Sequence, residues 1–390
     1  MTSSAFADRF LSRRAQEVSA IQGPQTSLPM KGAINLTVGP PEFSTPAHII
    51  EAAKRALDQG YTKTTPWPGF PDLREAIAEK LARDNGLQYD PAREILVTAG
   101  SQEALFVTHM ALLDPGDEII MPSPYYPAYE RDAIIAGGKL VKVPTLEENC
   151  FEVDPLEIEK CITPRTKAVL LLTPGNPTGT VISHRTLLKI ADLVKEHDLM
   201  VIADELYERW VWDDHKHHSM GTFPGMWERT LTVQGFSKSY SMTGFRVGYV
   251  AGPADFIQRM IGLKHSATIS TPAMSQRAAL AALKGPMDWW PEIFEIYAER
   301  RRLWLEALEE MGLSHGGSQG SFYIFVNITS TGMTSQEFVD ALFEEAKVLV
   351  GSGVGYGGEG YVRVSFQTPT EQLKAGLQRM TETVLRWRRG

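Results

Sequence analysis

The sequence predicts an α/β fold, in which a mostly parallel seven-stranded sheet lies between helices and is followed by a smaller α+β domain. Three observations support this prediction. The chain has 390 residues, of which 43% are hydrophobic, so it can bury a large core and form two domains. Between about Ile95 and Gly252, strand-like runs alternate with helical stretches. Most of these runs are continuously apolar, which is typical of a parallel sheet covered on both faces.

Seven strand candidates occur in this region. In chain order they are EILVTAG (94–100), DEIIMPS (117–123), KLVKVPT (139–145), AVLLLTP (168–174), LMVIADEL (199–206), TLTVQGF (230–236) and RVGYVAG (246–252). Helical patterns separate several of them, for example at 101–113 and 183–198. Because parallel strands need long crossover connections, this alternation predicts that the strands share one sheet.

The rest of the chain predicts the domain division. We expect a large domain at 45–286 and a small C-terminal domain at 287–390, with an N-terminal arm at 1–44 joining the small domain. The small domain begins with a strongly helical connector, 287–311. Its further candidates are the strands FYIFVN (322–327) and YVRVSF (361–366) and the helices at 335–348 and 371–389.

Composition argues against several classes of partner. The net charge is −8 and basic residues form no block, which argues against nucleic-acid binding. No apolar run reaches transmembrane length, and the N-terminal residues lack the apolar core of a signal peptide. The two cysteines, Cys150 and Cys161, then suggest reduced thiols. We expect a cytoplasmic protein.

A lysine follows the sixth strand candidate, in the run GFSKSYSMTGFRVGYV (235–250). Lys238, at the end of a buried strand, can form a Schiff base with an aldehyde, while Arg246 and the neighbouring hydroxyls can hold a phosphate. An aldehyde and a phosphate on one small molecule describe pyridoxal phosphate. The alternative is a surface lysine and arginine in an ordinary strand-loop-strand.

Three other strand ends carry polar groups. Asp204 follows an apolar strand, where a charged acid needs a cationic partner such as a protonated pyridine nitrogen; a helix N-cap is the alternative. Asn176 lies in a Pro-Gly-Asn-Pro sequence, which also suits an ordinary turn. Gly100 and Ser101 open a helix, whose free amides can bind an anion. Ligands of open α/β sheets bind at the carboxyl ends of strands, so we expect these groups to meet.

Jointly and in this order, these features resemble the class I and II aminotransferases, which are fold-type I pyridoxal-phosphate enzymes. The resemblance runs from INLTVGPPEFSTP (34–46) to YVRVSF (361–366). Its most specific pieces are PGNPTG (174–179), ADELY (203–207), SKSYSMTGFRVG (237–248) and Arg363. It implies the fold-type I architecture for the predicted sheet.

The resemblance implies a role for each residue toward pyridoxal phosphate. Lys238 would hold the cofactor as a Schiff base and then act as the proton-shuttling base. Asp204 would pair with the pyridine nitrogen, and Asn176 and Tyr207 would bond the phenolic oxygen. Lys238, Asp204 and Tyr207 are thus the implied catalytic residues. Tyr126 would stack on the ring, although core packing is the alternative. The phosphate would be bound by Gly100, Ser101, Gln102, Ser237 and Arg246.

The resemblance also implies how the substrate and a second subunit bind. Arg363 would clamp the substrate α-carboxylate in a bidentate fork, with Gly39 and Asn176 beside it; an exposed strand residue is the alternative for Arg363. The family forms homodimers with active sites at the interface. Related enzymes donate a tyrosine to the partner's phosphate site at the position of Thr64. Tyr61 lies three residues away, and whether it replaces that tyrosine stays open.

The implied reaction moves the amino group of an L-amino acid to a 2-oxo acid by a ping-pong mechanism. A lyase that catalyses β-elimination or cyclisation on the same scaffold is the alternative, because it would share the cofactor contacts.

The donor is the least determined part of the prediction. Dicarboxylate-specific relatives use an additional cationic side chain, and the aligned positions here hold Gln102 and Ser266. A neutral or aromatic amino acid is therefore expected, with 2-oxoglutarate or pyruvate as acceptor. Trp67, Phe70 and Tyr361 are candidates for an aromatic pocket, and core packing is their alternative.

Two further patterns are not taken as sites. The run Asp213 to His218 has no familiar metal-ligand spacing, so no metal is expected. Gly353-x-Gly355-x-x-Gly358 precedes a strand rather than a helix, which is the wrong context for a dinucleotide fingerprint.

Overall fold

The structure is a computed structural model that describes residues 9–21, 32–37 and 43–388. Its largest element is a seven-stranded sheet in the order β2-β8-β7-β6-β5-β3-β4. The strands are β2 (Ile95–Thr98), β3 (Glu118–Ser123), β4 (Lys139–Pro144), β5 (Thr166–Leu172), β6 (Met200–Asp204), β7 (Thr230–Gly235) and β8 (Gly248–Ala251). Strands β3 to β7 pair in parallel, whereas β8 is antiparallel to both its neighbours. The predicted, mostly parallel seven-stranded sheet is confirmed.

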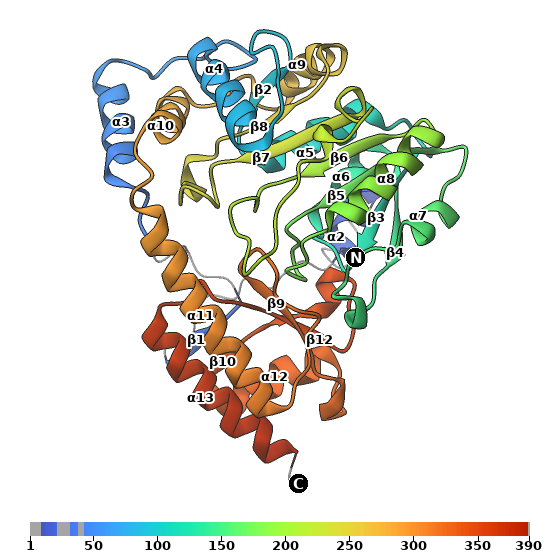
Figure 1. The fold of residues 1–390 in the computed structure, drawn as a ribbon, viewed down its shortest axis with the longest axis vertical. Coiled ribbons are helices and arrows are strands. Elements are labelled where there is room, and N and C mark those ends of the chain that lie inside the picture. The colour runs from blue at the N-terminus through green and yellow to red at the C-terminus, as the bar shows by residue number, and fades with distance from the viewer. Residues whose placement is uncertain (1–8, 22–31, 38–42, 389–390) are drawn as a thin grey trace.

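Helices cover both faces of this sheet (Figure 1). Along the chain they are α3 (Ala47–Asp58), α4 (Pro71–Lys80), α5 (Ser101–Leu112), α6 (Ala128–Ala136), α7 (Pro155–Lys160), α8 (His184–Glu196), α9 (Ala254–Thr268) and α10 (Ala273–Lys284). Successive residues of β5 belong to different cores. Leu170 packs with Leu105 of α5, and Val169 packs with Leu187 of α8. This explains the continuously apolar strands, because both faces of the sheet are buried.

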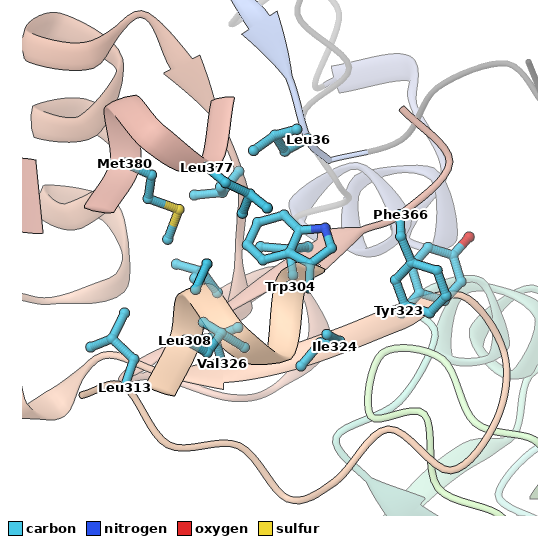
Figure 2. Packing of buried hydrophobic residues seen from close by; sticks show 14 of the residues in the cluster. Leu36, Trp304, Leu308, Leu313, Tyr323, Ile324, Val326, Phe366, Leu377 and Met380 are labelled. Carbon is cyan, nitrogen blue, oxygen red and sulfur yellow. The ribbon is translucent and has the colours of Figure 1, made fainter. Parts of the chain in front are cut away.

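A second, smaller sheet follows in the order β11-β12-β9. Its strands are β9 (Tyr323–Asn327), β11 (Gly351–Ser352) and β12 (Tyr361–Ser365). The helices of this part of the chain are α11 (Trp290–Met311), α12 (Ser335–Ala346) and α13 (Thr370–Trp387). Figure 2 shows Trp304 and Leu308 of α11 packed with Met380 of α13 and Val326 of β9, and all four are buried. Figure 1 shows α11 running from the seven-stranded part to this second sheet.

The N-terminal region contributes two elements. Strand β1 (Ile34–Asn35) pairs in parallel with β10 (Val348–Leu349), so it attaches to the C-terminal part. Helix α2 (Arg13–Ala20) lies against α6.

The β1–β10 pairing corrects one predicted boundary. The helix expected at 335–348 ends at Ala346, because Lys347 has a left-handed backbone with φ 55° and Val348 pairs with Ile34.

Candidate active site

One cavity of about 290 Å³ lies where the carboxyl ends of β5 and β6 and the residues after β7 meet β9 and β12 of the second sheet. It is lined by Ser101, Gln102, Leu105, Tyr126, Tyr129, Leu172, Asn176, Asp204, Leu206, Tyr207, Ser237, Lys238, Thr243, Arg246, Tyr323 and Arg363. The predicted site residues Ser101, Gln102, Tyr126, Asn176, Asp204, Tyr207, Ser237, Lys238, Arg246 and Arg363 are all among them. Gly100 lies beside Arg246 at the same edge, and Gly39 lies outside the described residues.

Two glycines form a narrow cradle at the start of α5. Gly100 has φ +87°, and a Cβ added there would lie 2.4 Å from Arg246 Nη2. A Cβ added at Gly248 would lie 2.5 Å from the backbone nitrogen of Ser101. Because neither glycine carries a Cβ, the backbone amides at the start of α5 and the Arg246 guanidinium can lie side by side. Together they form a positively polarised site suited to a phosphate.

Asp204 ends β6 and is only 3% exposed. Its Oδ2 accepts a hydrogen bond from the Tyr129 hydroxyl at 2.7 Å, and its Oδ1 accepts one from the Leu206 N–H at 3.1 Å. Burial raises the pKa of the Asp204 carboxyl to about 6, although these two donors favour the charged form. The Leu206 N–H belongs to a turn, and no helix begins in residues 205–210, so the alternative that Asp204 is a helix N-cap is wrong.

Lys238 lies three residues after the end of β7. The indole N–H of Trp210 donates to the backbone oxygen of Lys238 at 3.2 Å, which fixes the main chain there. The Nζ amine reaches the cavity and lies 5.6 Å from the centre of the Phe322 ring. An amine on a fixed backbone, facing a cavity, is suited to nucleophilic attack on a carbonyl.

Arg363 projects from β12 and is 2% exposed. Its Nη1 donates to Asn176 Oδ1 at 2.9 Å and its Nη2 to the Thr37 carbonyl at 3.3 Å. The guanidinium lies 4.3 Å from the Tyr323 ring centre and 4.6 Å from that of Tyr356.

Its Nε is buried and has no hydrogen-bond partner in the described part of the chain. An unpaired donor on a buried cation is costly, and a carboxylate ligand would satisfy it.

Tyr207 and Tyr323 both line the cavity, and their rings meet edge-on with centres 6.0 Å apart. Burial raises the pKa of Tyr207 well above its usual range. The pKa of Tyr323 is lowered, because the charges of Lys238 and Arg363 outweigh the effect of burial. The cavity therefore holds one strongly protonated phenol, that of Tyr207, and one more acidic phenol, that of Tyr323, on which the charge of the Lys238 amine acts.

The sequence alone did not identify six residues of this cavity, and two of these, Tyr129 and Tyr323, carry titratable side chains. Tyr129 is the second residue of α6 and lies three residues after Tyr126, which precedes the helix, and Tyr323 lies in a strand that reads as core. Its closeness in sequence to a predicted cavity residue was the available signal for Tyr129.

The three aromatic residues that were expected to form the substrate pocket, Trp67, Phe70 and Tyr361, are not among the residues that line the cavity. Trp67 packs on His265 with ring centres 3.9 Å apart, and Phe70 packs on Tyr61. Tyr361 stacks on Phe325 at 4.9 Å. The rings that line the cavity are instead those of Tyr126, Tyr129, Tyr207 and Tyr323.

A cluster of acidic and histidine side chains lies next to β6 on the side of the His-rich run. Ligand atoms of Glu205, Glu208 and His217 lie within 4.8 Å of one another. The Lys80 ammonium already pairs with Glu208, and Gln234 donates to both carboxylates. The Lys80 cation thus balances the charge of Glu208, and the Glu205 carboxylate is held by hydrogen bonds from Gln234, Ser219 and the Met220 N–H.

In the described ranges, no helix is long and apolar enough to cross a membrane.

An amine, a carboxylate, an anion cradle and a buried arginine thus meet at the strand ends of an α/β sheet. This arrangement is suited to an enzyme that binds a small carboxylate substrate and a phosphate-bearing ligand.

Comparisons with known proteins identify the family. The profile described as "Aminotransferase class I and II" matches residues 31–380. The chain is 45% identical to an aspartate aminotransferase of Pyrococcus abyssi, over 92% of each chain. It is 42% identical to aromatic-amino-acid aminotransferase 2 of Thermococcus litoralis, over 91% of this chain and 92% of that protein. The crystal structure of an aromatic aminotransferase from Pyrococcus horikoshii superposes with a TM-score of 0.89 at 43% identity, covering 92% of this chain and 97% of that one.

The chain belongs to the class I and II aminotransferases. It is a transferase that acts on amino acids, and members of this family depend on pyridoxal phosphate. None of these relatives supports the lyase alternative.

Proposed function

We propose that this aminotransferase holds pyridoxal phosphate in the cavity and moves amino groups from neutral or aromatic L-amino acids to a 2-oxo acid. One observation carries the substrate part of the proposal. In the part of the chain that the structure describes, the cations that line the cavity are Lys238, Arg246 and Arg363. The cofactor and the substrate α-carboxylate engage all three, which leaves none for a second carboxylate.

The residues present fit the cofactor. The cradle of Gly100, Ser101 and Arg246 suits a phosphate, and Gln102 and Ser237 add polar groups beside it. Asp204 would face the ring nitrogen, and Tyr126 would cover one face of the ring. The Asn176 carbonyl oxygen is engaged by Arg363, so its amide nitrogen is the end suited to donate to the phenolic oxygen. When bound, pyridoxal phosphate supplies an aldehyde for amines and a ring that withdraws electrons from the adjacent carbon.

The residues of the chain then divide the remaining work. Arg363 binds the α-carboxylate and orients the substrate. The Lys238 amine would take the proton from the substrate α-carbon and would deliver a proton to the carbon that pyridoxal phosphate contributes as its aldehyde, so one base would serve both positions. Tyr207 holds its hydroxyl proton beside that amine. Asp204, in its charged form, keeps a proton on the ring nitrogen opposite.

The contacts of Gln102, which lines the cavity, also favour amino acids with neutral side chains as substrates. The Gln102 amide nitrogen donates to Asp132 Oδ2 at 2.9 Å, so the side chain is held by an acid rather than a cation. Four tyrosines and three leucines supply the aromatic and apolar surface of the cavity. The same argument favours pyruvate over 2-oxoglutarate among the two predicted acceptors.

We further propose a homodimer, with a large domain at 45–286 and a small domain at 287–390 joined by the N-terminal arm at 1–44. Two apolar side chains support a partner surface: Trp67 is 49% exposed and Ile269 is 52% exposed. Tyr61 packs on Phe70 and lies under Arg277, so it is already engaged within its own chain. Sedimentation velocity would test the dimer. A cytoplasmic location is supported by two free cysteines, and cell fractionation would test it.

The substrate proposal is tested by half-reactions. Each amino acid is added to the purified protein loaded with pyridoxal phosphate, and the change in cofactor absorbance and the released 2-oxo acid are followed. We expect phenylalanine, tyrosine and leucine to react with kcat/KM at least about tenfold above that of aspartate, the ratio that one missing charge contact gives. A higher kcat/KM for aspartate would overturn the substrate proposal and leave the family assignment intact.

A further inference from the structure

Tyr129 lines the cavity and donates a hydrogen bond to Asp204, which lies 75 residues further along the chain. It belongs to α6, is 1% exposed, and donates its hydroxyl to Asp204 Oδ2 at 2.7 Å. Burial, and then the charge of Asp204, raise the pKa of the Tyr129 phenol well above its usual range. The phenol therefore stays protonated and acts as the donor at every physiological pH.

Asp204 depends on this donor because its other surroundings disfavour a charge. Burial raises the pKa of its carboxyl, and the neighbouring Glu205 carboxylate acts in the same direction. The Leu206 N–H is the second donor. Within the described residues, Asp204 forms no ion pair with a lysine, arginine or histidine, and the other titratable group facing it is Tyr207. One hydroxyl and one amide thus stabilise the charged carboxylate before any ligand binds.

The ring of Tyr129 has a second contact. It meets the Tyr126 ring edge-on, with centres 5.7 Å apart and planes at 84°. Tyr126 is the residue expected to cover the cofactor ring. The two ends of Tyr129 therefore reach two different expected cofactor contacts, the carboxylate through the hydroxyl and the stacking ring through the aromatic edge.

We propose that Tyr129 is a positioning residue, which keeps Asp204 charged and correctly turned to hold the ring nitrogen of the cofactor. This inference rests on the proposed function, in which pyridoxal phosphate occupies the cavity. It assigns Tyr129 a role that the reaction requires indirectly, because Tyr129 acts through Asp204 and not on the substrate.

The test is the pH dependence of cofactor binding, measured as the dissociation constant of pyridoxal phosphate from pH 5 to 8.5. A protonated Asp204 cannot pair with a protonated ring nitrogen, so affinity is lost as pH falls through the pKa of that carboxyl. In Tyr129→Phe the charged form loses one donor, so this fall should move to higher pH by about one unit. With a wild-type pKa of about 6 moved up by about one unit, the dissociation constant should rise about tenfold at pH 5 and about twofold at pH 7.

Tyr125→Phe is the matched control, because the Tyr125 hydroxyl donates to Glu130 and not to the cavity. Tyr125→Phe should leave the pH dependence of the dissociation constant of pyridoxal phosphate unchanged. If Tyr129 acted only through packing, Tyr129→Phe would weaken binding equally at every pH, and the positioning role would be wrong. A curve identical to the wild-type one would also overturn it. If the wild-type protein itself did not bind the cofactor, the proposed function would be wrong instead.

A second variant keeps the test open if Tyr129→Phe does not fold. Replacing Tyr129 with 3,5-difluorotyrosine keeps the ring and the hydroxyl but makes the hydroxyl a stronger donor. The fall in affinity should then move to lower pH. No movement in this folded variant would contradict the inference.

Discussion

Arg363 Nη1 lies 2.9 Å from Asn176 Oδ1, and this hydrogen bond joins the two sheets of the molecule across the cavity. Arg363 belongs to β12 of the small sheet, and Asn176 lies in the turn after β5 of the large sheet. With Nη2 held by the Thr37 carbonyl, the plane of the guanidinium is set before a substrate arrives. A carboxylate ligand then meets a fork that is already oriented.

Arg363→Lys should therefore impair substrate binding although it keeps the charge. A lysine ammonium cannot bond Asn176, Thr37 and a carboxylate in one plane, so kcat/KM for the donor should fall about 10- to 100-fold. Steady-state kinetics with the best donor would measure this. Arg302→Lys, on the exposed face of α11, is the control and should change little. An unaffected kcat/KM in Arg363→Lys would mean that the α-carboxylate binds elsewhere.

Gly100→Ala should weaken binding of the cofactor phosphate. The new methyl group would lie 2.4 Å from Arg246 Nη2 on a backbone with φ +87°, so the arginine has to move. Such strain costs about 1–3 kcal/mol, which corresponds to a roughly 5- to 150-fold higher dissociation constant for pyridoxal phosphate. Gly262→Ala in α9 is the matched control, because a Cβ there meets nothing within 4 Å. Equal affinity in both variants would show that the cradle does not depend on Gly100.

Lys80→Met should destabilise the fold. Lys80 is buried and its ammonium contacts Glu208, Gln234 and Asn85, so its removal leaves a buried carboxylate without a cation. The free energy of unfolding should fall by about 3–5 kcal/mol in urea titrations. Lys160→Met removes an exposed pair with Glu157 and should cost less than about 1 kcal/mol. Similar losses in the two variants would contradict the role of the network.

Asp132→Asn should change how stability depends on pH. Burial raises the pKa of Asp132 to about 7, so the folded chain keeps a proton that the unfolded chain releases near pH 4. Because of this group, the free energy of unfolding of the wild-type protein falls by up to about 4 kcal/mol between pH 4 and pH 7. Above pH 7 the contribution of Asp132 no longer changes with pH. The variant lacks this loss, and the amide oxygen of its new side chain can still accept a hydrogen bond from Gln102.

The measurement for Asp132 is chemical unfolding of the cofactor-free protein at pH 5 and pH 8. Relative to wild type, Asp132→Asn should gain about 1–4 kcal/mol at the higher pH. A constant difference between the two proteins would contradict a raised pKa at this position.

Much of the site was predictable because its residues end strands. Lys238, Asp204 and Asn176 each follow an apolar run, and a parallel sheet brings the ends of such runs to one edge. The pattern of apolar residues predicts both a strand and the residue at which it ends. The parallel arrangement of the strands then predicts that the groups at these ends lie close together, even though their individual contacts are not known.

The remaining parts depend on tertiary packing, which a pattern does not encode. Tyr129 reads as one more core aromatic in a helix, and only the fold brings its hydroxyl to Asp204. Trp67 and Tyr361 were plausible pocket residues by type, yet they pack on His265 and Phe325. Aromatic rings satisfy a core and a pocket equally well, so their position had to come from the structure.

The proposed function requires that Lys238 is the amine that bonds the cofactor. Borohydride reduction of the protein loaded with pyridoxal phosphate, followed by peptide mass spectrometry, would identify that amine. We expect a pyridoxyl group on the peptide that contains Lys238. A label on another lysine, such as the buried Lys80 or Lys264, or no covalent label at all, would contradict the role of Lys238.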